Sequence, residues 1–357
     1  MGLTSSSRAP SHSSCRNLAI ICRMLELNHI PLNKPNALLD SSRDDRLGTI
    51  AFGASSFNDV AAITIETIAI PSQNNFFEVW RTDKKTTSGQ FEALNYRHDD
   101  DVLFGSITLA ETDFVTDATS TALQKATASA YRQIFELLAR LSFRHLWRVW
   151  NFIPQINLHS DGIERYRQFN IERSAAFDNS GRATEGNVPA ASAVGANGSL
   201  SIYFLAGRNA PIAIENPRQL SAYRYPSEYG PRSPIFSRAS LIELDEQEIV
   251  FISGTASIVG HRTLHVGDVM AQTEELLLNI DAVLDETNKS TQRTRFTRAD
   301  LFYRVYLRDA DDFSRVQAIL RGWLGTAPRA VYLQADICRA DLMVEIEASG
   351  GHLMDIS

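Results

Sequence analysis

Alternating apolar and polar positions near the C-terminus predict a β-hairpin. Residues 331–338 and 342–348 are rich in β-branched side chains that alternate with polar ones, and the polar residues 339–341 separate them. Alternation broken by a short polar turn is typical of two paired antiparallel strands. Because successive side chains of a strand point to opposite faces, the second arm has one apolar face and one face that carries two glutamates.

These two glutamates, Glu345 and Glu347, indicate proton chemistry. Like charges two residues apart on one face of a strand repel each other, so stability alone rarely favours the pair. Glu345 also lies between Val344 and Ile346, and burial beside a second carboxylate raises the pKa of a carboxyl group. We interpret Glu345 as a general acid or base and Glu347 as its exposed or structural neighbour. A solvent-facing strand edge is the alternative.

The rest of the C-terminal half has the order strand, helix, strand, helix, followed by the hairpin. An apolar run with a glycine predicts the first strand, and the helix after it begins at an Asp268 N-cap. An acidic turn precedes the second helix. The predicted ranges are 249–259, 269–285, 299–307 and 313–324.

The N-terminal half repeats this order at an offset of about 145 residues, which favours a duplication. Chance similarity of two α+β stretches is the alternative. Tyr203 and Phe204 occupy the region that corresponds to Glu345, so we expect the second copy to carry the chemistry. The predicted ranges are 104–109, 119–141, 145–153, 163–177 and 199–205.

Composition narrows the class of protein. The chain of 357 residues is 44% hydrophobic and has a net charge of −7, which suggests two domains and argues against nucleic acid or an anionic membrane as a partner. Its three cysteines form no paired framework, and no apolar run is long enough to span a membrane. We therefore expect a cytoplasmic protein, with residues 1–44 as a partly disordered extension.

The connection at residues 215–240 contains four prolines, four arginines and three tyrosines. Such a composition predicts a packed irregular loop that can form the wall of a site. Arg224, Arg232 and Arg238 are candidate anion ligands because guanidinium groups bind carboxylates in a bidentate manner; ordinary surface arginines are the alternative. Tyr229 is a candidate hydrogen-bond donor or a simple packing residue.

Other residues that can carry chemistry give weaker signals. Cys338 precedes the turn and, taken alone, fits a small buried hydrophobic residue. Gly254 lies inside a β-rich run, which indicates either a close approach of backbone or ligand, or a bulge. His261 and His265 lack the carboxylate partner of a zinc motif, so we expect no metal site.

The order of several motifs resembles the chorismatase family over residues 45–348. Residues 248–348 are also similar to the reactive-intermediate deaminase fold (Rid, YjgF-like). The segments that carry the resemblance are ERYRQF (164–169), YGPRSPIFSRA (229–239), ISGTAS (252–257), GDVMAQT (267–273), YRVYLRDADDF (303–313), QADICR (334–339) and VEIEA (344–348).

This resemblance implies an α+β fold of two Rid/YjgF-like domains (chorismate mutase-like α/β) in a pseudo-duplication, with mixed sheets and helices packed on one face of each. Residues 45–235 would form a degenerate N-terminal domain that includes the arginine-rich and tyrosine-rich loop, and residues 236–357 the catalytic domain. Rid proteins are trimers with sites between subunits. A duplicated chain is therefore expected to be a monomer or a small homo-oligomer.

The resemblance also implies a reaction without a cofactor, in which chorismate is cleaved and pyruvate is released. Glu345 matches the residue that protonates the enolpyruvyl methylene group, and Arg238 with Arg304 would hold the substrate carboxylates. The branch that forms 3-hydroxybenzoate has a glycine and a cysteine in its pocket, which we match to Gly254 and Cys338. We therefore expect 3-hydroxybenzoate as the product.

Three alternatives stay open from the sequence. A hydrolytic branch of the family has alanines at the two pocket positions and forms 3,4-dihydroxycyclohexa-1,5-diene-1-carboxylate. A third branch forms both 3- and 4-hydroxybenzoate. A Rid-like imine deaminase, or a protein that only binds a small molecule on this fold, belongs to a different class.

Overall fold

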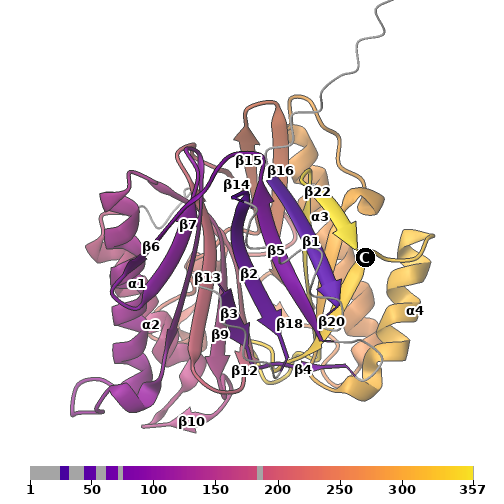
Figure 1. Ribbon diagram of the computed structural model, residues 1–357. Helices are drawn as coiled ribbons and strands as arrows, with labels where there is room; N and C mark the ends of the chain where they lie inside the picture. Colours follow the sequence, from indigo (N-terminus) through magenta and orange to yellow (C-terminus); the bar gives the residue numbers. More distant parts are fainter. Residues whose placement is uncertain (1–24, 32–43, 54–61, 71–74, 183–187, 357) are drawn as a thin grey trace, which may run out of the picture.

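The structure, a computed structural model, describes residues 25–31, 44–53, 62–70, 75–182 and 188–356. Within these ranges the chain forms three large β-sheets, two small two-stranded ribbons and four α-helices (Figure 1). Two of the large sheets carry helices on their outer faces, and the third sheet lies across the front of both in this view. The ribbons are β10 (His159–Ser160) with β11 (Ile163–Glu164), and β17 (Ile258–Val259) with β18 (Arg262–Thr263).

The N-terminal helix-covered sheet has the strand order β12-β9-β13-β8-β7-β6. Helix α1 (Ala122–Arg140) begins with a capping box in which Thr121 and Gln124 satisfy each other's backbone N–H groups. Together with α2 (Arg165–Asn179), it packs on one face of the sheet. The strands are β6 (Thr87–Phe91), β7 (Leu94–His98), β8 (Val102–Leu109), β9 (His145–Pro154), β12 (Ala190–Ala196) and β13 (Leu200–Gly207).

The C-terminal helix-covered sheet has the order β14-β15-β16-β21-β19-β20-β4. Helix α3 (Val269–Ser290) begins at the predicted N-cap, because the Asp268 carboxylate accepts from two backbone N–H groups of the first turn. It packs on one face beside α4 (Phe313–Leu324). The strands are β4 (Ile68–Ala69), β14 (Ile212–Ile214), β15 (Ala239–Leu244), β16 (Gln247–Thr255), β19 (Phe302–Leu307), β20 (Ala330–Gln334) and β21 (Val344–Gly350).

These two sheets have the same topology. Six strands of each follow in corresponding order, and the strand pair at one end is parallel in both (β9 with β12, β19 with β20) whereas the neighbouring pairs are antiparallel. The pseudo-duplication expected from the repeated element order is therefore confirmed at the level of topology. On β13, Tyr203 faces the sheet interface, so this copy has no carboxylate there.

The predicted C-terminal hairpin is wrong. Strands β20 and β21 do not pair with each other, because β19 lies between them. β19 is parallel to β20 and antiparallel to β21. The residues between β20 and β21 therefore cross over one strand and do not form a tight turn, which leaves room for a site at this end of the sheet.

The third sheet, with the order β22-β1-β5-β2-β3, was not expected. Its edge strand β22 comes from the C-terminus and runs parallel to β1, which lies within the predicted N-terminal extension. Part of the segment 1–44 is thus an ordered strand, and the remainder lies outside the described residues. The strands are β1 (Leu25–Pro31), β2 (Arg46–Phe52), β3 (Ala62–Ile65), β5 (Phe76–Thr82) and β22 (Leu353–Ile356).

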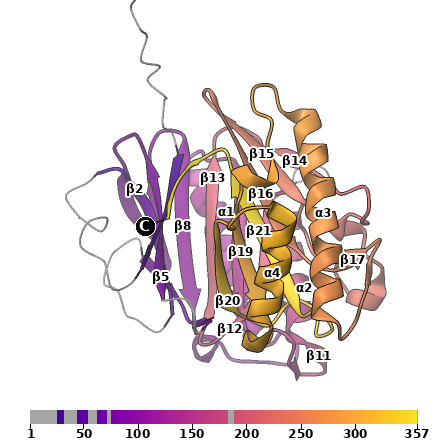
Figure 2. The same ribbon diagram turned by 90° about the vertical axis from the view of Figure 1, so that its right-hand side faces the viewer.

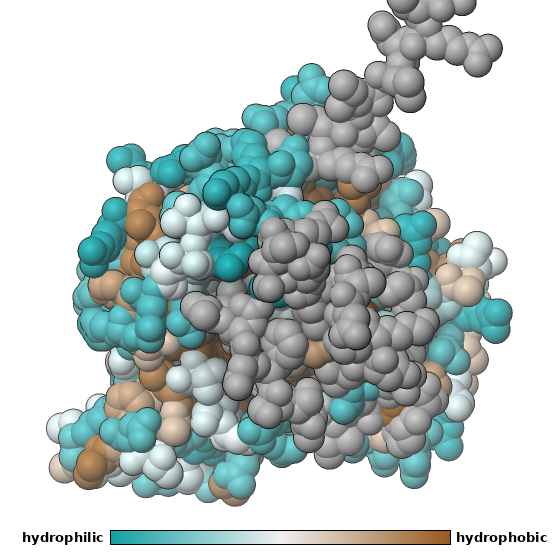
Figure 3. Space-filling view, in the orientation of Figure 1, coloured by the Kyte–Doolittle hydropathy of each residue, from teal (hydrophilic) through white to brown (hydrophobic). Residues whose placement is uncertain are grey.

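Three layers of apolar side chains hold these parts together. One core lies between α1, α2 and the N-terminal sheet, and another lies between α3, α4 and the C-terminal sheet (Figure 2). A third core lies where the inner faces of all three sheets meet, and it contains Trp80, Trp150 and Phe251. Hydrophilic residues cover much of the described surface on the side shown in Figure 3. The two halves therefore share a buried interface, and the third sheet closes it.

We predicted a domain boundary between residues 235 and 236, but the C-terminal sheet already begins before this position in the chain. β14 at 212–214 already pairs with β15 of the C-terminal sheet. After β14 the chain runs as turns and short 3-10 segments up to β15, as the proline-rich composition predicted. This connection lies at the mouth of the site described next.

Candidate active site

A cavity of about 230 Å³ lies between the two halves of the chain. The connection between the halves, predicted from the sequence as the wall of a site, supplies six of its lining residues between Gln219 and Arg238. Most of the others come from β16, residues 256–258, β21 and the residues before β21, and the start of α2 closes the cavity from the N-terminal half. Of the eight site residues predicted from the sequence, five line this cavity. These are Tyr229, Arg238, Gly254, Cys338 and Glu345.

Glu345 is the buried acid of the cavity. It lies on the inner face of β21, and its side chain is only 3% exposed. Burial, reinforced by the negative charge of Glu347 and opposed by Arg148, raises the pKa of Glu345 to about 8. Among the described residues, no side chain or backbone group forms a hydrogen bond with its carboxyl group. Glu345 is therefore a neutral carboxylic acid at pH 7 whose proton is available to a bound molecule.

Gly254 lets this carboxyl group approach the backbone of β16. A Cβ atom at position 254 would lie 2.0 Å from Glu345 Oε1 and 3.1 Å from Ser192 Oγ. The backbone N–H of Gly254 donates to Ser192 Oγ at 3.1 Å. Here β16 shifts register against β21. The close approach and the bulge, the two explanations of a glycine in a strand, thus occur together.

Cys338 lies beside the acid on the crossing segment before β21. It is a free, partly buried thiol, and burial, together with the nearby Glu345, raises its pKa to about 12. The thiol is therefore protonated and uncharged at neutral pH, which makes it a poor nucleophile. Its contribution to the site is a small apolar surface next to the carboxyl group of Glu345.

Arg238 supplies a buried positive charge to the cavity wall. Its side chain is 4% exposed, and Nη2 donates to the Leu220 carbonyl at 2.7 Å and to the Tyr225 hydroxyl at 3.0 Å. The guanidinium carbon lies 5.1 Å from the centre of the Phe236 ring. Nε is buried without a hydrogen-bond partner among the described residues. A buried N–H without a partner is costly, so this donor suits an anionic ligand.

Arg339 supplies a second cation that the sequence did not identify as a site residue. Its guanidinium group stacks on Tyr229, with 4.0 Å between the guanidinium carbon and the ring centre, and Nη1 donates to the His261 carbonyl at 2.9 Å. Nη2 is buried and has no partner among the described residues. The sequence pattern assigned Arg339 to a polar turn, although this residue also ends QADICR (334–339), one of the segments that carried the family resemblance.

The start of α2 adds polar groups from the N-terminal half. Glu164, Tyr166 and Arg167 all line the cavity. Burial raises the pKa of Tyr166 above its ordinary value, and the phenol therefore stays neutral. Arg167 Nε pairs with Glu164 at 3.2 Å. The segment ERYRQF was one of those that carried the family resemblance, although we assigned no site residue to it.

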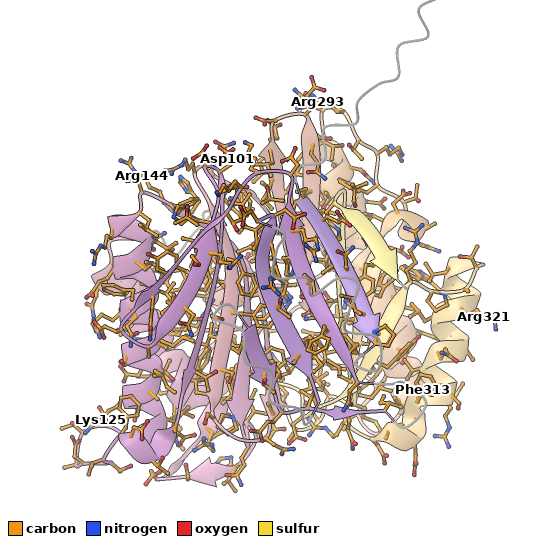
Figure 4. All side chains as sticks on the ribbon, in the orientation of Figure 1. Asp101, Lys125, Arg144, Arg293, Phe313 and Arg321 are labelled. Atoms are coloured by element: carbon orange, nitrogen blue, oxygen red, sulfur yellow. The ribbon has the colours of Figure 1, made fainter. Side chains whose placement is uncertain are left out.

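The other three predicted residues do not reach the cavity. Arg304 is buried and paired with Glu78 and Glu347 where the three sheets meet, so its expected role as a substrate ligand is corrected. Arg224 and Arg232 are exposed and absent from the cavity wall, and Arg232 lies 3.6 Å from a carboxylate oxygen of Asp178. Other arginines of the surface, Arg144, Arg293 and Arg321, point away from the body of the protein (Figure 4).

The described residues contain no group of three or more His, Cys, Asp or Glu side chains that could hold a metal ion. His261 instead lies within hydrogen-bonding distance of the Tyr229 hydroxyl, at 3.2 Å. No helix in the described part of the chain is long and apolar enough to cross a membrane. The cavity thus combines a neutral carboxylic acid, a neutral thiol and three guanidinium groups, of which those of Arg238 and Arg339 each have a buried nitrogen without a partner among the described residues. Such an arrangement can bind a small organic anion and donate a proton to it.

Comparisons with known proteins agree with this geometry. The family profile described as "Chorismatase FkbO/Hyg5-like, N-terminal" matches residues 78–206, and the profile "Endoribonuclease L-PSP" matches residues 237–350. A 3-hydroxybenzoate synthase from Streptomyces hygroscopicus is 36% identical over 287 residues, which cover 78% of this chain and 82% of that protein. A chorismatase from the same organism is 36% identical over 278 residues, which cover 76% and 78%.

A solved structure gives the same result for the fold. The crystal structure of a chorismatase aligns with a TM-score of 0.82 at 32% sequence identity, and the alignment covers 92% of this chain and 98% of that chain. The alignment therefore spans nearly the whole length of both chains.

Proposed function

The chain belongs to the chorismatase family, and on this premise we propose that it cleaves chorismate, releases pyruvate and forms 3-hydroxybenzoate. The observation that carries the proposal is the neutral, buried Glu345 carboxyl group, which faces a cavity with two incompletely paired guanidinium groups. Chorismate is a dianion, so two guanidinium groups can bind its two carboxylates and the acid can protonate its enolpyruvyl group.

In this proposal Glu345 donates its proton to the methylene carbon of the enolpyruvyl group. The methylene becomes a methyl group, and positive charge develops on the carbon that carries the ether oxygen. The electron pair of the bond between ring and ether oxygen then moves to form the carbonyl of pyruvate. General acid catalysis of such a step contributes roughly 10²–10⁴-fold.

The adjacent ring hydroxyl completes the reaction without added water. Its oxygen attacks the ring carbon that loses pyruvate, and its proton returns to the Glu345 carboxylate, which restores the acid. In the resulting arene oxide the bond from oxygen to the former hydroxyl carbon breaks, the carbon that keeps the oxygen loses its ring proton, and the oxygen gains one proton, which gives 3-hydroxybenzoate. Gly254 and Cys338 support this route. Gly254 lets the carboxyl group lie close to β16, and the uncharged thiol of Cys338 beside it does not hold a water molecule in position for attack.

Arg238 and Arg339 are the proposed ligands of the two carboxylates. Each has one buried N–H group without a partner among the described residues, and a carboxylate would satisfy it with a charge-assisted hydrogen bond. The Tyr225 and Tyr229 rings support these cations by stacking. Fixing both ends of the dianion would place its enolpyruvyl group at Glu345, and such orientation can lower the barrier by several kcal/mol.

Incubation of the purified protein with chorismate tests the proposal. We expect equimolar pyruvate and 3-hydroxybenzoate, identified by chromatography and mass spectrometry. Glu345→Gln should lower turnover by roughly 10²–10⁴-fold without unfolding, and Glu243→Gln, at an exposed position on β15, is the matched control. Absence of pyruvate refutes the proposal, a non-aromatic diene supports the hydrolytic branch, and full activity of the Glu345→Gln variant refutes the role of the acid.

A further inference from the structure

A cluster of buried charges lies behind Glu345, on the side away from the cavity, and its centre is Glu347. Four groups donate to this carboxylate. Ser192 Oγ and Arg148 Nη2 contact Oε2 at 2.5 and 2.6 Å, and Arg304 Nη1 and Trp150 Nε1 contact Oε1 at 2.6 and 2.8 Å. Four donors occupy the positions that a carboxylate offers, and two of them are guanidinium groups, so Glu347 forms two buried ion pairs.

The charges of this cluster balance. Arg148 and Arg304 supply two cations, and Glu347 and Glu78 supply two carboxylates, with Arg304 shared between both acids. All four side chains are at most 6% exposed, and they come from the three different sheets. Since both cations are already paired, none is left for Glu345. An ionised Glu345 would be an uncompensated buried charge, which is strongly unfavourable.

Ser192 links the cluster to the acid. Its hydroxyl group donates to Glu347 and accepts from the backbone N–H of Gly254 at 3.1 Å. The Glu345 carboxyl group lies against this same glycine. The anchoring of Glu347 therefore fixes the serine and, through it, the strand segment on which the acid rests.

We propose that Glu347 is a positioning residue that keeps Glu345 protonated and holds it against Gly254 in the orientation needed for proton donation. This inference rests on the proposed role of Glu345 as the acid. Glu347 would act on the reaction only through its neighbour, because it does not line the cavity. The two glutamates of one strand face then have different tasks, one as the proton donor and the other as the fixed negative charge beside it.

Other ionisable groups also face Glu345 and are kept constant in the test. On the adjacent strand β19, Tyr306 is opposite Glu345 in register. Other elements contribute the uncharged groups Tyr166 and Cys338, and the charged cavity residues Glu164, Arg167, Arg238, Arg339 and Asp341. Burial raises the pKa of Tyr306, Tyr166 and Cys338, so these three are neutral across the pH range used. None of these residues is changed in any of the variants.

Two substitutions with opposite expected effects test the proposal. Glu347→Gln removes a negative charge and leaves an excess cation near Glu345, which favours the ionised acid. The fall of kcat/KM at high pH should then begin at a pH lower by about one unit, with activity regained in more acidic buffer. Arg148→Gln removes a cation instead, and its profile should move to higher pH. Glu347→Asp keeps the charge and should keep the position of the profile, although kcat falls.

Glu248→Gln is the control for a purely structural effect. Glu248 is a buried carboxylate on β16 that accepts from three backbone N–H groups away from the cavity. Its loss should lower the melting temperature and leave the pH profile in place. If Glu347→Gln or Arg148→Gln yields folded protein with the wild-type profile, the inference is overturned. Since the two predicted shifts are opposite, either folded variant alone decides.

The protonation of Glu345 can also be followed without turnover. A protonated carboxyl group has its own infrared band, and the band that is lost in Glu345→Gln can be assigned to Glu345. Measuring the intensity of this band against pH gives the pKa of Glu345 directly. A shift of this titration in Glu347→Gln supports the inference even if the protein does not convert chorismate. Chorismate turnover with an unshifted titration refutes the inference and leaves the proposed function intact.

Discussion

Replacing Gly254 with alanine places one methyl group where the acid now lies. The added Cβ would be 2.0 Å from Glu345 Oε1 and 2.7 Å from its Cδ, whereas 3.4 Å is an ordinary contact. The carboxyl group must therefore retreat by about 1.4 Å, since the backbone of β16 is held by its neighbours on both sides. The end of a glutamate side chain is flexible, so the cost to stability should be about 1 kcal/mol.

The effect on the reaction should be much larger than the effect on stability. Misplacing a catalytic group by about 1 Å can cost on the order of 10²-fold, so we expect kcat to fall by about that factor. KM should change little, because the three atoms nearest to the new methyl group belong to Glu345 and Ser192 and not to Arg238 or Arg339. The product should also shift from 3-hydroxybenzoate toward the non-aromatic diene, since the displaced carboxylate no longer recovers the ring hydroxyl proton and water gains access.

A coupled assay of pyruvate release gives kcat and KM, and chromatography of the same mixtures gives the product ratio. Gly322→Ala is the matched control. A Cβ at this position of α4 meets no atom within 4 Å, and alanine should stabilise the helix by roughly 0.5–1 kcal/mol. Wild-type kcat and product ratio in the folded Gly254→Ala protein would refute the reasoning, because they would show that Glu345 does not need its place against the glycine.

Three further predictions concern the activity and product of the site, and a fourth concerns the stability of the folded protein. The kcat/KM of the wild-type protein should fall as pH rises through about 8, because the acid works protonated and its pKa is raised to about 8; constant activity up to about pH 10 would contradict this. Arg238→Met should raise KM at least roughly tenfold with a smaller change in kcat, since one charge-assisted bond to the substrate is lost; an unchanged KM would exclude Arg238 as a ligand. Cys338→Ala should move the product toward the diene without abolishing pyruvate release, and an unaltered product ratio would show that the thiol does not control the outcome. As pH rises from 4.5 to about 8, the free energy of unfolding of the wild-type protein should fall relative to that of Glu345→Gln, because the unfolded chain releases the proton of Glu345 in this range whereas the folded protein keeps it. Melting temperatures that change in parallel for the two proteins across this range would argue against a buried acid.

Local patterns in the sequence predicted the four helices and seven of the thirteen strands of the two helix-covered sheets. Helix α4 has the predicted bounds, and the Asp268 N-cap was identified because a short polar side chain before an amphipathic run has a direct local effect. The third sheet escaped prediction because its strands come from both ends of the chain, and β1 pairs with β22 across almost the whole length of the chain. No local pattern contains information about such a pairing.

Site residues could be predicted where the local sequence pattern decides their position, as for Glu345, but not where the packing of distant segments decides it, as for the arginines. The alternation in β21 placed Glu345 and Glu347 on one face of the strand, and the structure adds that this face is buried and that Gly254 contacts Glu345. For arginines the sequence offered four candidates of similar appearance. Of these four only Arg238 reaches the cavity. Two further arginines line it, Arg339 from a predicted turn and Arg167 from the helix predicted at 163–177.

Arg304 shows why the strand order was needed to tell which arginines reach the cavity. A C-terminal hairpin would have left β19 outside the pair, with Arg304 free to point into a cleft. In the structure β19 is inserted beside β21, and its register places Arg304 opposite Glu347 and Tyr306 opposite Glu345. Directly opposite residues share a face of the sheet, so the arginine pairs with the second glutamate and leaves the first without a cation. The same strand order that removes Arg304 from the substrate therefore makes Glu345 a neutral acid.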